Sequence, residues 1–330
     1  MAEAAFDVLG VGNAIVDVLA QSDDRFLAGH GLDKGMMTLI DAERAHQLYD
    51  AMGPAVEMSG GSAANTLAGI ASLGGAGAYI GKVRNDQLGG VFSHDLRAAG
   101  VDYRSWPAES GPPTARCLIF VTADAQRTMQ TYLGVSVELG PGDIDPEAVG
   151  SAHITYLEGY LFDRPEAKQA FVKATDIAHA AGRRVALTLS DPFCVDRHRG
   201  EFRHLVEGHI DILFANQAEI ESLYQAANFD EALQHVRGHC DVAALTRGPK
   251  GSVVVAGDEV HVVDAEPVKR VIDTTGAGDL FAAGFLFGLT RDRNLAACAR
   301  IGGLTAAEVI GHYGARPEAA LSKLMDDSGI

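Results

Sequence analysis

The amino-acid sequence predicts an α/β fold in which a mainly parallel central sheet is covered by helices on both faces and accompanied by a small β-sheet. Three observations lead to this prediction. Short β-branched or apolar runs alternate with longer helical patterns over residues 6–248, as in parallel strands joined by helices. Two regions, at 114–132 and 252–263, break this alternation with consecutive strand-like runs. No linker rich in Ser, Pro or Gly divides the chain, so we expect one domain over residues 1–330.

The strands of the main sheet are expected at the short buried runs, which are residues 6–12, 78–83, 153–159, 184–190, 210–216 and 242–248. Between the first two runs, A-A-N-T-L-A-G-I-A-S-L-G-G at 63–75 predicts a helix that ends at glycines. The run S-V-V-V-A-G-D-E-V-H-V-V at 252–263 predicts an antiparallel hairpin around a polar turn. The run C-L-I-F-V-T-A-D-A-Q-R-T-M-Q-T-Y at 117–132 predicts two more strands, which we expect to form a small lid.

The charge and the cysteine pattern restrict the partners of the protein. Asp and Glu number 44 against 27 Lys and Arg, which gives a net charge of −17. Because such a surface repels phosphate backbones, we expect no nucleic-acid partner, although local donors can still bind a small anion. The four cysteines are far apart and no basic leader is found, so we expect a reduced, cytoplasmic protein. The longest apolar run, within 271–289, is too short to cross a membrane.

The stretch D-T-T-G-A-G-D, which ends at Asp279 and precedes an apolar helical segment, has the residue types of an anion site. A helix N-terminus presents free N–H groups and a partial positive charge. The N–H groups of Gly276, Ala277 and Gly278 can surround a phosphate oxygen there, because glycines let a ligand approach the backbone. Asp279 can accept the proton of an attacking hydroxyl, as phosphoryl transfer requires. The alternative is ordinary helix capping, with Thr275 as the N-cap and Asp279 against the helix dipole.

A second motif, G-G-S-A-A-N, occupies Gly60 to Asn65 at the start of the predicted helix. Together, the two motifs resemble the two signatures of the ribokinase-like (pfkB-type) family of carbohydrate and nucleoside kinases. The resemblance implies a Rossmann-like αβα sandwich with a small β-sheet lid, whose segments we expect at about 15–40 and 112–133. It also implies transfer of the γ-phosphate of ATP to a hydroxyl of a small-molecule substrate. Asp279 is then the catalytic base, and Gly276 to Gly278 form the anion hole.

Several stretches resemble the adenosine-kinase branch of this family. G-N-A-I-V-D, which contains Asn13 and Asp17, resembles its G-N-P-L-L-D opening, and L-T-L-S-D-P-F resembles its N-L-S-x-P-F segment. I-D-I-L-F-A-N-Q-A-E resembles V-D-I-L-F-G-N-x-x-E, which implies Mg²⁺ near Asn216 and Glu219, held through water. With L-T-R-G-P-K-G-S, the resemblance implies nucleotide contacts at Asn216, Thr246, Gly248, Gly251 and Thr274. Adenosine is therefore the expected acceptor.

The acceptor is expected near the end of the first strand, where α/β folds bind ligands. The carboxylate of Asp17 can accept both hydroxyls of a ribose, and the resemblance adds Asn13, Gly60, Gly61 and Asn65 to this site. The candidates for an adenine slot are Leu133, Val135, Tyr160 and Phe162, although apolar residues near strand ends are more often core.

These residues also have structural interpretations. Asp17 alone is a solvated loop acid, Asn65 an exposed polar residue of a helix, and Gly60-Gly61 a loop before a helix that Ser62 caps.

Two alternatives for the function stay open. Because D-T-T-G-A-G-D also occurs in sugar kinases, a kinase of ribose, fructose or a related sugar is the first. A non-catalytic nucleotide or metabolite sensor on the same scaffold is the second. The sequence leaves open whether a monovalent cation such as K⁺ is needed and whether the protein is a monomer or a homodimer.

Overall fold

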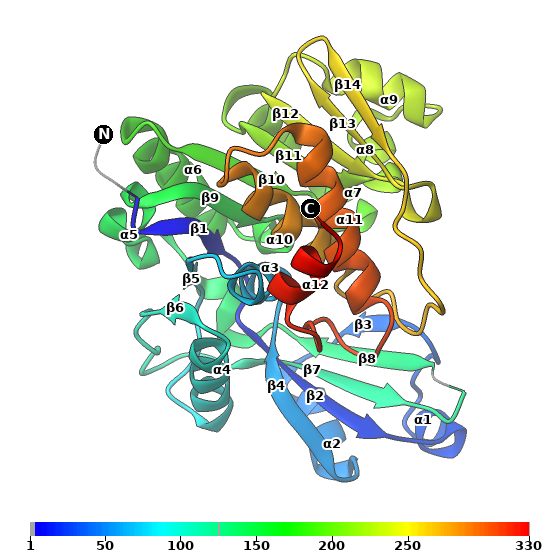
Figure 1. Ribbon diagram of the computed structural model, residues 1–330. Coiled ribbons are helices and arrows are strands. Elements are labelled where there is room, and N and C mark those ends of the chain that lie inside the picture. Colours follow the sequence, from blue (N-terminus) through cyan, green and yellow to red (C-terminus); the bar gives the residue numbers. More distant parts are fainter. Residues whose placement is uncertain (1–3, 125, 330) are drawn as a thin grey trace.

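The computed structural model describes residues 4–124 and 126–329, which form a large sheet and a small sheet (Figure 1). Within the described residues, the large sheet has nine strands in the order β14 (Glu259–Val263), β13 (Ser252–Ala256), β12 (Val242–Thr246), β11 (Ile212–Asn216), β10 (Arg184–Thr188), β9 (Ala152–Glu158), β1 (Phe6–Val11), β5 (Gly77–Ile80) and β6 (Val101–Tyr103). From β12 to β6 all neighbours are parallel. The predicted hairpin at 252–263 is confirmed as the antiparallel pair β13 and β14.

Helices cover both faces of the large sheet, as predicted. One face packs against α3 (Ser62–Ser72), α4 (Gln87–Ala98), α10 (Ala277–Leu289), α11 (Leu295–Val309) and α12 (Leu321–Asp327). The other face packs against α5 (Pro146–Gly150), α6 (Pro165–Ala180), α7 (Pro192–Gly208), α8 (Gln217–Tyr224) and α9 (Phe229–Val236). Successive strand residues enter opposite cores, with Val8 in the first and Leu9 in the second, because side chains alternate along a strand.

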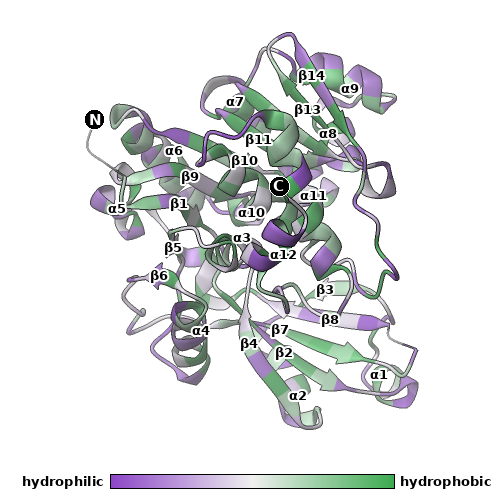
Figure 2. Cartoon of the chain, in the orientation of Figure 1, coloured by the Kyte–Doolittle hydropathy of each residue, from purple (hydrophilic) through white to green (hydrophobic). Residues whose placement is uncertain are grey.

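The small sheet forms the lid and lies below the large sheet in Figure 1. Its strand order is β3 (Met37–Leu39), β8 (Arg127–Tyr132), β7 (Ala115–Val121), β2 (Ile15–Gln21) and β4 (Ala55–Gly60). Strands β2 and β7 are strongly hydrophobic (Figure 2), and their core side packs with α1 (Asp24–Gly29) and α2 (Ala42–Ala51). In this core the rings of Phe26 and Phe120 lie 5.1 Å apart. The segments expected at 15–40 and 112–133 hold all these strands except β4, which the sequence reading did not assign.

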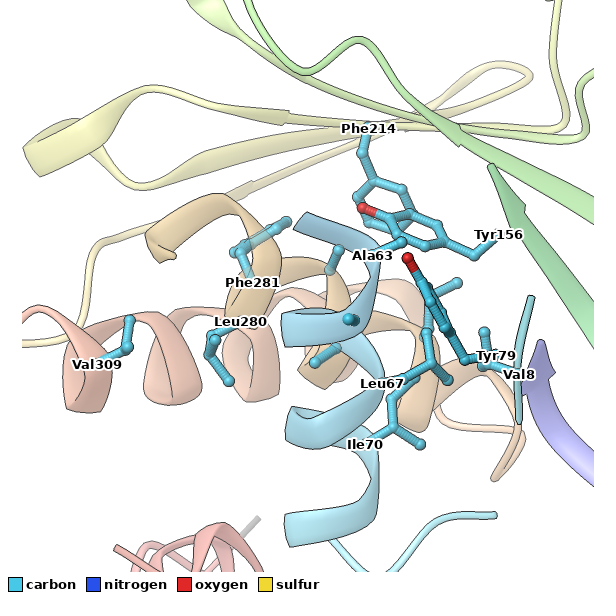
Figure 3. Packing of buried hydrophobic residues seen from close by; sticks show 14 of the residues in the cluster. Val8, Ala63, Leu67, Ile70, Tyr79, Tyr156, Phe214, Leu280, Phe281 and Val309 are labelled. Atoms are coloured by element: carbon cyan, nitrogen blue, oxygen red, sulfur yellow. The ribbon is translucent and has the colours of Figure 1, made fainter. Parts of the chain in front are cut away.

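Helices α3 and α10 lie side by side on the same face of the large sheet, and the two glycine motifs lie at their N-termini (Figure 1). Gly69 permits this approach, because a Cβ there would lie 2.7 Å from the Cβ of Ala283. On the side of α3 that faces the large sheet, Leu67 points toward Tyr79 (Figure 3). This packing holds α3 between the sheet and α10. Among the described residues, no helix has the length and apolar character that a membrane span requires.

Candidate active site

The N-cap of each motif helix is a glycine with a positive φ, and neither helix has a side-chain cap. The N-cap of α3 is Gly61, with a φ of 95°, and that of α10 is Gly276, with a φ of 79°. A Cβ at Gly61 would lie 2.3 Å from the carbonyl oxygen of Asn13, so no other residue fits there. The expected alternative in which Ser62 caps α3 is therefore wrong.

Asp279 lies in the first turn of α10 and is held by two side chains of α3. The Ser62 hydroxyl donates to its Oδ1 at 2.6 Å, and Asn65 Nδ2 donates to its Oδ2 at 2.9 Å. Burial raises the pKa of the Asp279 carboxyl, while these two hydrogen bonds and the charge of Arg316 oppose the rise. No ion pair within 4 Å involves Asp279 in the described part of the chain, although other carboxylates form such pairs. An oriented carboxylate with a raised pKa is suited to accept a proton.

The backbone before Asp279 presents amides at the positive end of α10. Ala277 N donates to the Thr274 carbonyl at 3.2 Å, whereas no hydrogen bond from the amides of Gly276 and Gly278 is found over residues 4–124 and 126–329. Ala315 packs against Gly276, where a Cβ would lie 2.7 Å from the Ala315 Cβ. Two of the three amides expected in the anion hole are thus free to receive a ligand, and the third is directed at Thr274.

Asp17 extends from β2 of the lid and is half-buried. Gly60 makes room for it, because a Cβ there would lie 2.5 Å from an Asp17 carboxylate oxygen. Burial raises the pKa of Asp17 to about 6, with Asp279 adding to the rise and Arg127 and Arg316 opposing it. Asp279 is therefore near enough to act on the charge of Asp17, so the fold brings the two predicted acids to one site.

Arg127 of β8 ties the lid to the loop before α10. Its Nη1 donates to Asp273 Oδ2 and, at 2.9 Å, to Thr275 Oγ1. The side chains of Arg127 and Asp273 are only 8% and 7% exposed. The Thr275 hydroxyl in turn donates to Asp273 Oδ1 at 2.7 Å, so the alternative in which Thr275 caps α10 is wrong. No local pattern around Arg127 indicated this contact, because its partner lies 146 positions away.

Glu158, at the end of β9, was not singled out from the sequence. Its buried carboxylate accepts Asn13 N at 3.3 Å, Asn13 Nδ2 at 3.0 Å and Ala63 N at 2.9 Å. Burial raises the pKa of Glu158 to about 7. Asn13 is 1% exposed and also accepts the Ser136 hydroxyl at 3.0 Å, so its side chain is bound within the protein. An acid at the carboxyl end of a predicted parallel strand was the signal that could have identified Glu158.

The four candidates for an adenine slot differ in burial. Val135 is fully buried in the 3₁₀ helix Gly134–Glu138, whereas Leu133 is half-buried. Tyr160 is 38% exposed, and its N–H donates to the Ser190 hydroxyl at 3.0 Å. Leu133 and Tyr160 therefore retain surface for a ligand, and Val135 and Phe162 lie in the core.

The residues expected to contact the nucleotide lie at the carboxyl ends of β11 and β12 and in nearby turns. Thr246 ends β12, and Gly248 and Gly251 follow with φ values of 56° and 77°. A Cβ at Gly251 would lie 2.0 Å from the Val263 carbonyl oxygen, so this turn requires glycine. Thr274 is exposed in the loop before α10.

Asn216 and Glu219 form a reciprocal cap at the start of α8. Asn216 N donates to Glu219 Oε2 at 2.8 Å, and Glu219 N donates to Asn216 Oδ1 at 2.9 Å. Burial raises the pKa of Glu219 to about 7. Across the residues the structure describes, no three potential metal ligands gather at one point. These oxygens fit Mg²⁺ only indirectly, by accepting from metal-bound water.

The mainly parallel sheet, the lid and an acid beside free amides define a phosphotransferase scaffold, and residues 33–321 match the family model of the pfkB family carbohydrate kinases. The chain belongs to this family. Adenosine kinase from Sinorhizobium meliloti is 53% identical, with a TM-score of 0.91 over 98% of this chain and 100% of that chain. A probable sugar kinase protein from Rhizobium etli CFN 42 is 51% identical, with a TM-score of 0.92 over 99% of both chains.

More distant relatives carry the same similarity. Adenosine kinase from Saccharomyces cerevisiae is 26% identical over 307 residues, which are 86% of this chain and 89% of that protein. The predicted family, the ribokinase-like fold and the assignment as a kinase are thereby confirmed.

Proposed function

We propose that this protein is an ATP-dependent kinase that transfers the γ-phosphate to the primary hydroxyl of adenosine. One observation supports this most directly. The Asp279 carboxylate, whose pKa burial raises, is held by Ser62 and Asn65 directly beside the free amides of Gly276 and Gly278. A base and donors for negative charge at one point are what phosphoryl transfer needs.

On the acceptor side, Asp17 accepts two ribose hydroxyls, which orients the primary hydroxyl toward Asp279. Asn65 Oδ1 is buried without a hydrogen-bond partner among the described residues, so it offers one more acceptor there. Gly60 and Gly61 line the same space. Asn13 does not face this space; its side chain donates to Glu158, which also binds the first turn of α3. Asp279 then takes the proton as the hydroxyl oxygen attacks the γ-phosphorus, the bond from this phosphorus to the bridging oxygen of ATP breaks, and ADP leaves, while the free amides of Gly276 and Gly278 receive the negative charge of the transferred group.

On the nucleotide side, ATP contacts residues at the ends of β11 and β12 and at the loop before α10, namely Asn216, Thr246, Gly248, Gly251 and Thr274. The oxygens of Asn216 and Glu219 would hold the water shell of a Mg²⁺ ion bound with ATP, and this ion would neutralise phosphate charge. Activity with and without K⁺ tests whether a monovalent cation takes part.

Adenosine is supported by the 53% identity to the Sinorhizobium meliloti adenosine kinase. The second candidate, a sugar kinase, is favoured by the 51% identity to the Rhizobium etli protein. An acceptor panel with ATP and Mg²⁺ separates them, with ADP release as the readout. Saturation by adenosine at low concentration supports the proposal, and turnover of ribose or fructose alone contradicts it. No ADP release with any acceptor would favour the sensor alternative.

The control for this panel is Asp279→Asn, which keeps the size of the side chain and removes the base. We expect turnover to fall by about 100-fold or more with little change in KM, because the base acts in the transition state. Near-normal turnover of this variant would contradict the assignment of Asp279.

A further inference from the structure

Arg316 lies in the segment after α11 and makes contacts that the sequence did not suggest. Its Nε and Nη2 donate to the Ser59 carbonyl at 3.3 and 3.1 Å, and Nη2 also donates to Ser59 Oγ at 2.9 Å. Its Nη1 donates to the Ala64 carbonyl at 3.0 Å. Ser59 precedes Gly60-Gly61, and Ala64 follows them, so one guanidinium bonds both sides of the di-glycine.

The partner on the lid side is itself fixed. Ser59 N and Ser59 Oγ donate to Asp95 Oδ2 of α4 at 2.7 and 2.6 Å. Because the Ser59 hydroxyl donates to Asp95, it accepts from Arg316. The end of β4 is therefore held by both Asp95 and Arg316. Because β4 pairs with β2 in the register Met58↔Asp17, this contact also determines where Asp17 stands.

The partner on the helix side leads to the catalytic acid. Ala64 belongs to the first turn of α3, between Ser62 and Asn65, which hold Asp279. The same C-terminal segment contacts the anion-hole loop, since Gly314 N donates to Asp273 Oδ2 at 3.0 Å. Arg316 thus joins the lid strand to α3, and Gly314 of the same segment contacts the loop before α10.

The charge of Arg316 faces the two acids of the site. It lowers the pKa of Asp17 and of Asp279 against the effect of burial. Among the described residues, no carboxylate forms an ion pair with Arg316 within 4 Å. The guanidinium charge therefore acts on both Asp17 and Asp279 rather than on one paired acid. The charged and titratable groups around these three residues are Asp95 and Tyr79 beside Arg316, Arg127 and Cys117 beside Asp17, and Glu158, Tyr156 and Tyr160 beside Asp279.

We propose that Arg316 is a positioning residue of the catalytic centre, which sets the placement of Asp17 relative to Asp279 by bonding both sides of the di-glycine and which faces both carboxylates with its charge. This inference rests on the proposed kinase function. It predicts two separable effects, one on the geometry of the di-glycine and one on the charge of the acids.

The test compares Arg316→Met, which removes the donors and the charge, with Arg316→Lys, which keeps the charge but cannot bond Ser59 and Ala64 with a planar fork. The matched control is Arg104→Met, because Arg104 pairs with Asp102 on the surface and its side chain is 79% exposed. Hydrogen exchange of residues 55–66 reports the geometry without any activity assay. The acidic limb of the profile of kcat/KM for adenosine against pH reports the charge.

For Arg316→Met we expect faster exchange of 55–66, a fall in kcat/KM of about 100-fold from misplacement, and a shift of the acidic limb to higher pH by about one unit. For Arg316→Lys we expect the faster exchange with the acidic limb near that of the wild type. Should Arg316→Met fail to fold, hydrogen exchange of Arg316→Lys still tests the effect on the di-glycine geometry. The acidic limb of Arg316→Gln then tests the effect of the charge.

Unchanged exchange in Arg316→Lys together with an unshifted acidic limb in Arg316→Met or Arg316→Gln would overturn the inference. A wild-type protein that phosphorylates adenosine alongside such variants leaves the proposed function intact. A wild-type protein without kinase activity contradicts the function, while the exchange data still report on the di-glycine contact.

Discussion

Asn65 of α3 donates through Nδ2 to Asp279 Oδ2 of α10 at 2.9 Å, although 214 positions separate the two residues in the chain. The contact joins the di-glycine motif to the anion-hole motif. Ser62, three residues before Asn65, holds the other carboxylate oxygen. The orientation of the proposed base therefore depends on a helix from the first quarter of the chain.

Removal of the two donors should impair the base without removing it. For Asn65→Ala and Ser62→Ala we expect kcat to fall about 10-fold each, because Asp279 loses its orientation and its pKa rises further. The acidic limb of the profile of kcat against pH should move to higher pH. Steady-state kinetics over a pH series measure both effects. Ser93→Ala is the control, since the Ser93 hydroxyl donates to the Gly89 carbonyl within α4. An identical shift in this variant would refute the explanation.

Asp17→Asn should weaken the acceptor site. An amide replaces one acceptor oxygen by a donor, so only one of its two terminal atoms can still accept a ribose hydroxyl. We expect KM for adenosine to rise at least 10-fold, about 1.4 kcal/mol of binding free energy, with KM for ATP nearly unchanged. In the wild type, KM for adenosine should also rise below about pH 6, where Asp17 becomes protonated. Equal changes in both KM values would contradict this assignment.

The same substitution should stabilise the fold at high pH. Because the pKa of Asp17 is raised from 3.8 to about 6 in the folded protein, folding favours the protonated form. This contribution is complete below about pH 4 and is lost as the pH rises through about 6. Asp17→Asn should therefore exceed the wild type in free energy of unfolding by on the order of 1 kcal/mol at about pH 8. Urea unfolding at about pH 8 and at about pH 4 measures this difference, which should shrink at the lower pH.

Gly276→Ala and Gly278→Ala should separate folding from ligand approach. Gly276 has a φ of 79° and packs on Ala315, so alanine there should cost about 1–2 kcal/mol of stability or more. Gly278 is helical, and a Cβ there meets no atom within 4 Å. We expect Gly278→Ala to fold normally, yet to lose turnover because the methyl group limits access to the amides. Thermal unfolding and kcat, measured on both variants, test this pair; full activity of Gly278→Ala would contradict the anion hole.

Glu158→Ala should destabilise the junction between β1 and α3. It leaves Asn13 N, Asn13 Nδ2 and Ala63 N without their acceptor in a buried site. We expect a loss of about 2–4 kcal/mol in the free energy of unfolding. Glu207→Ala is the control, because Glu207 pairs with Arg203 on the exposed side of α7. Equal losses in both variants would contradict the role of Glu158.

The α/β fold, the hairpin β13 and β14, and the two glycine motifs could all be predicted from the sequence because their causes are local. Alternating apolar runs and turn residues act over a few positions, and D-T-T-G-A-G-D carries its anion site within one helix start. Asp279 and Asp17 could be chosen as acids for the same reason, since each follows a motif or a strand end.

The tertiary structure alone decided which groups control those acids. Arg127 pairs with Asp273 over 146 positions, Arg316 reaches Ser59 over 257, and Glu158 reaches Asn13 over 145. Contacts at such separations leave no periodicity or spacing in the chain, because they depend on how the lid, α3 and the C-terminal segment pack together. The same packing buried Val135 and made Gly276 and Gly61, rather than Thr275 and Ser62, the N-caps of the two motif helices.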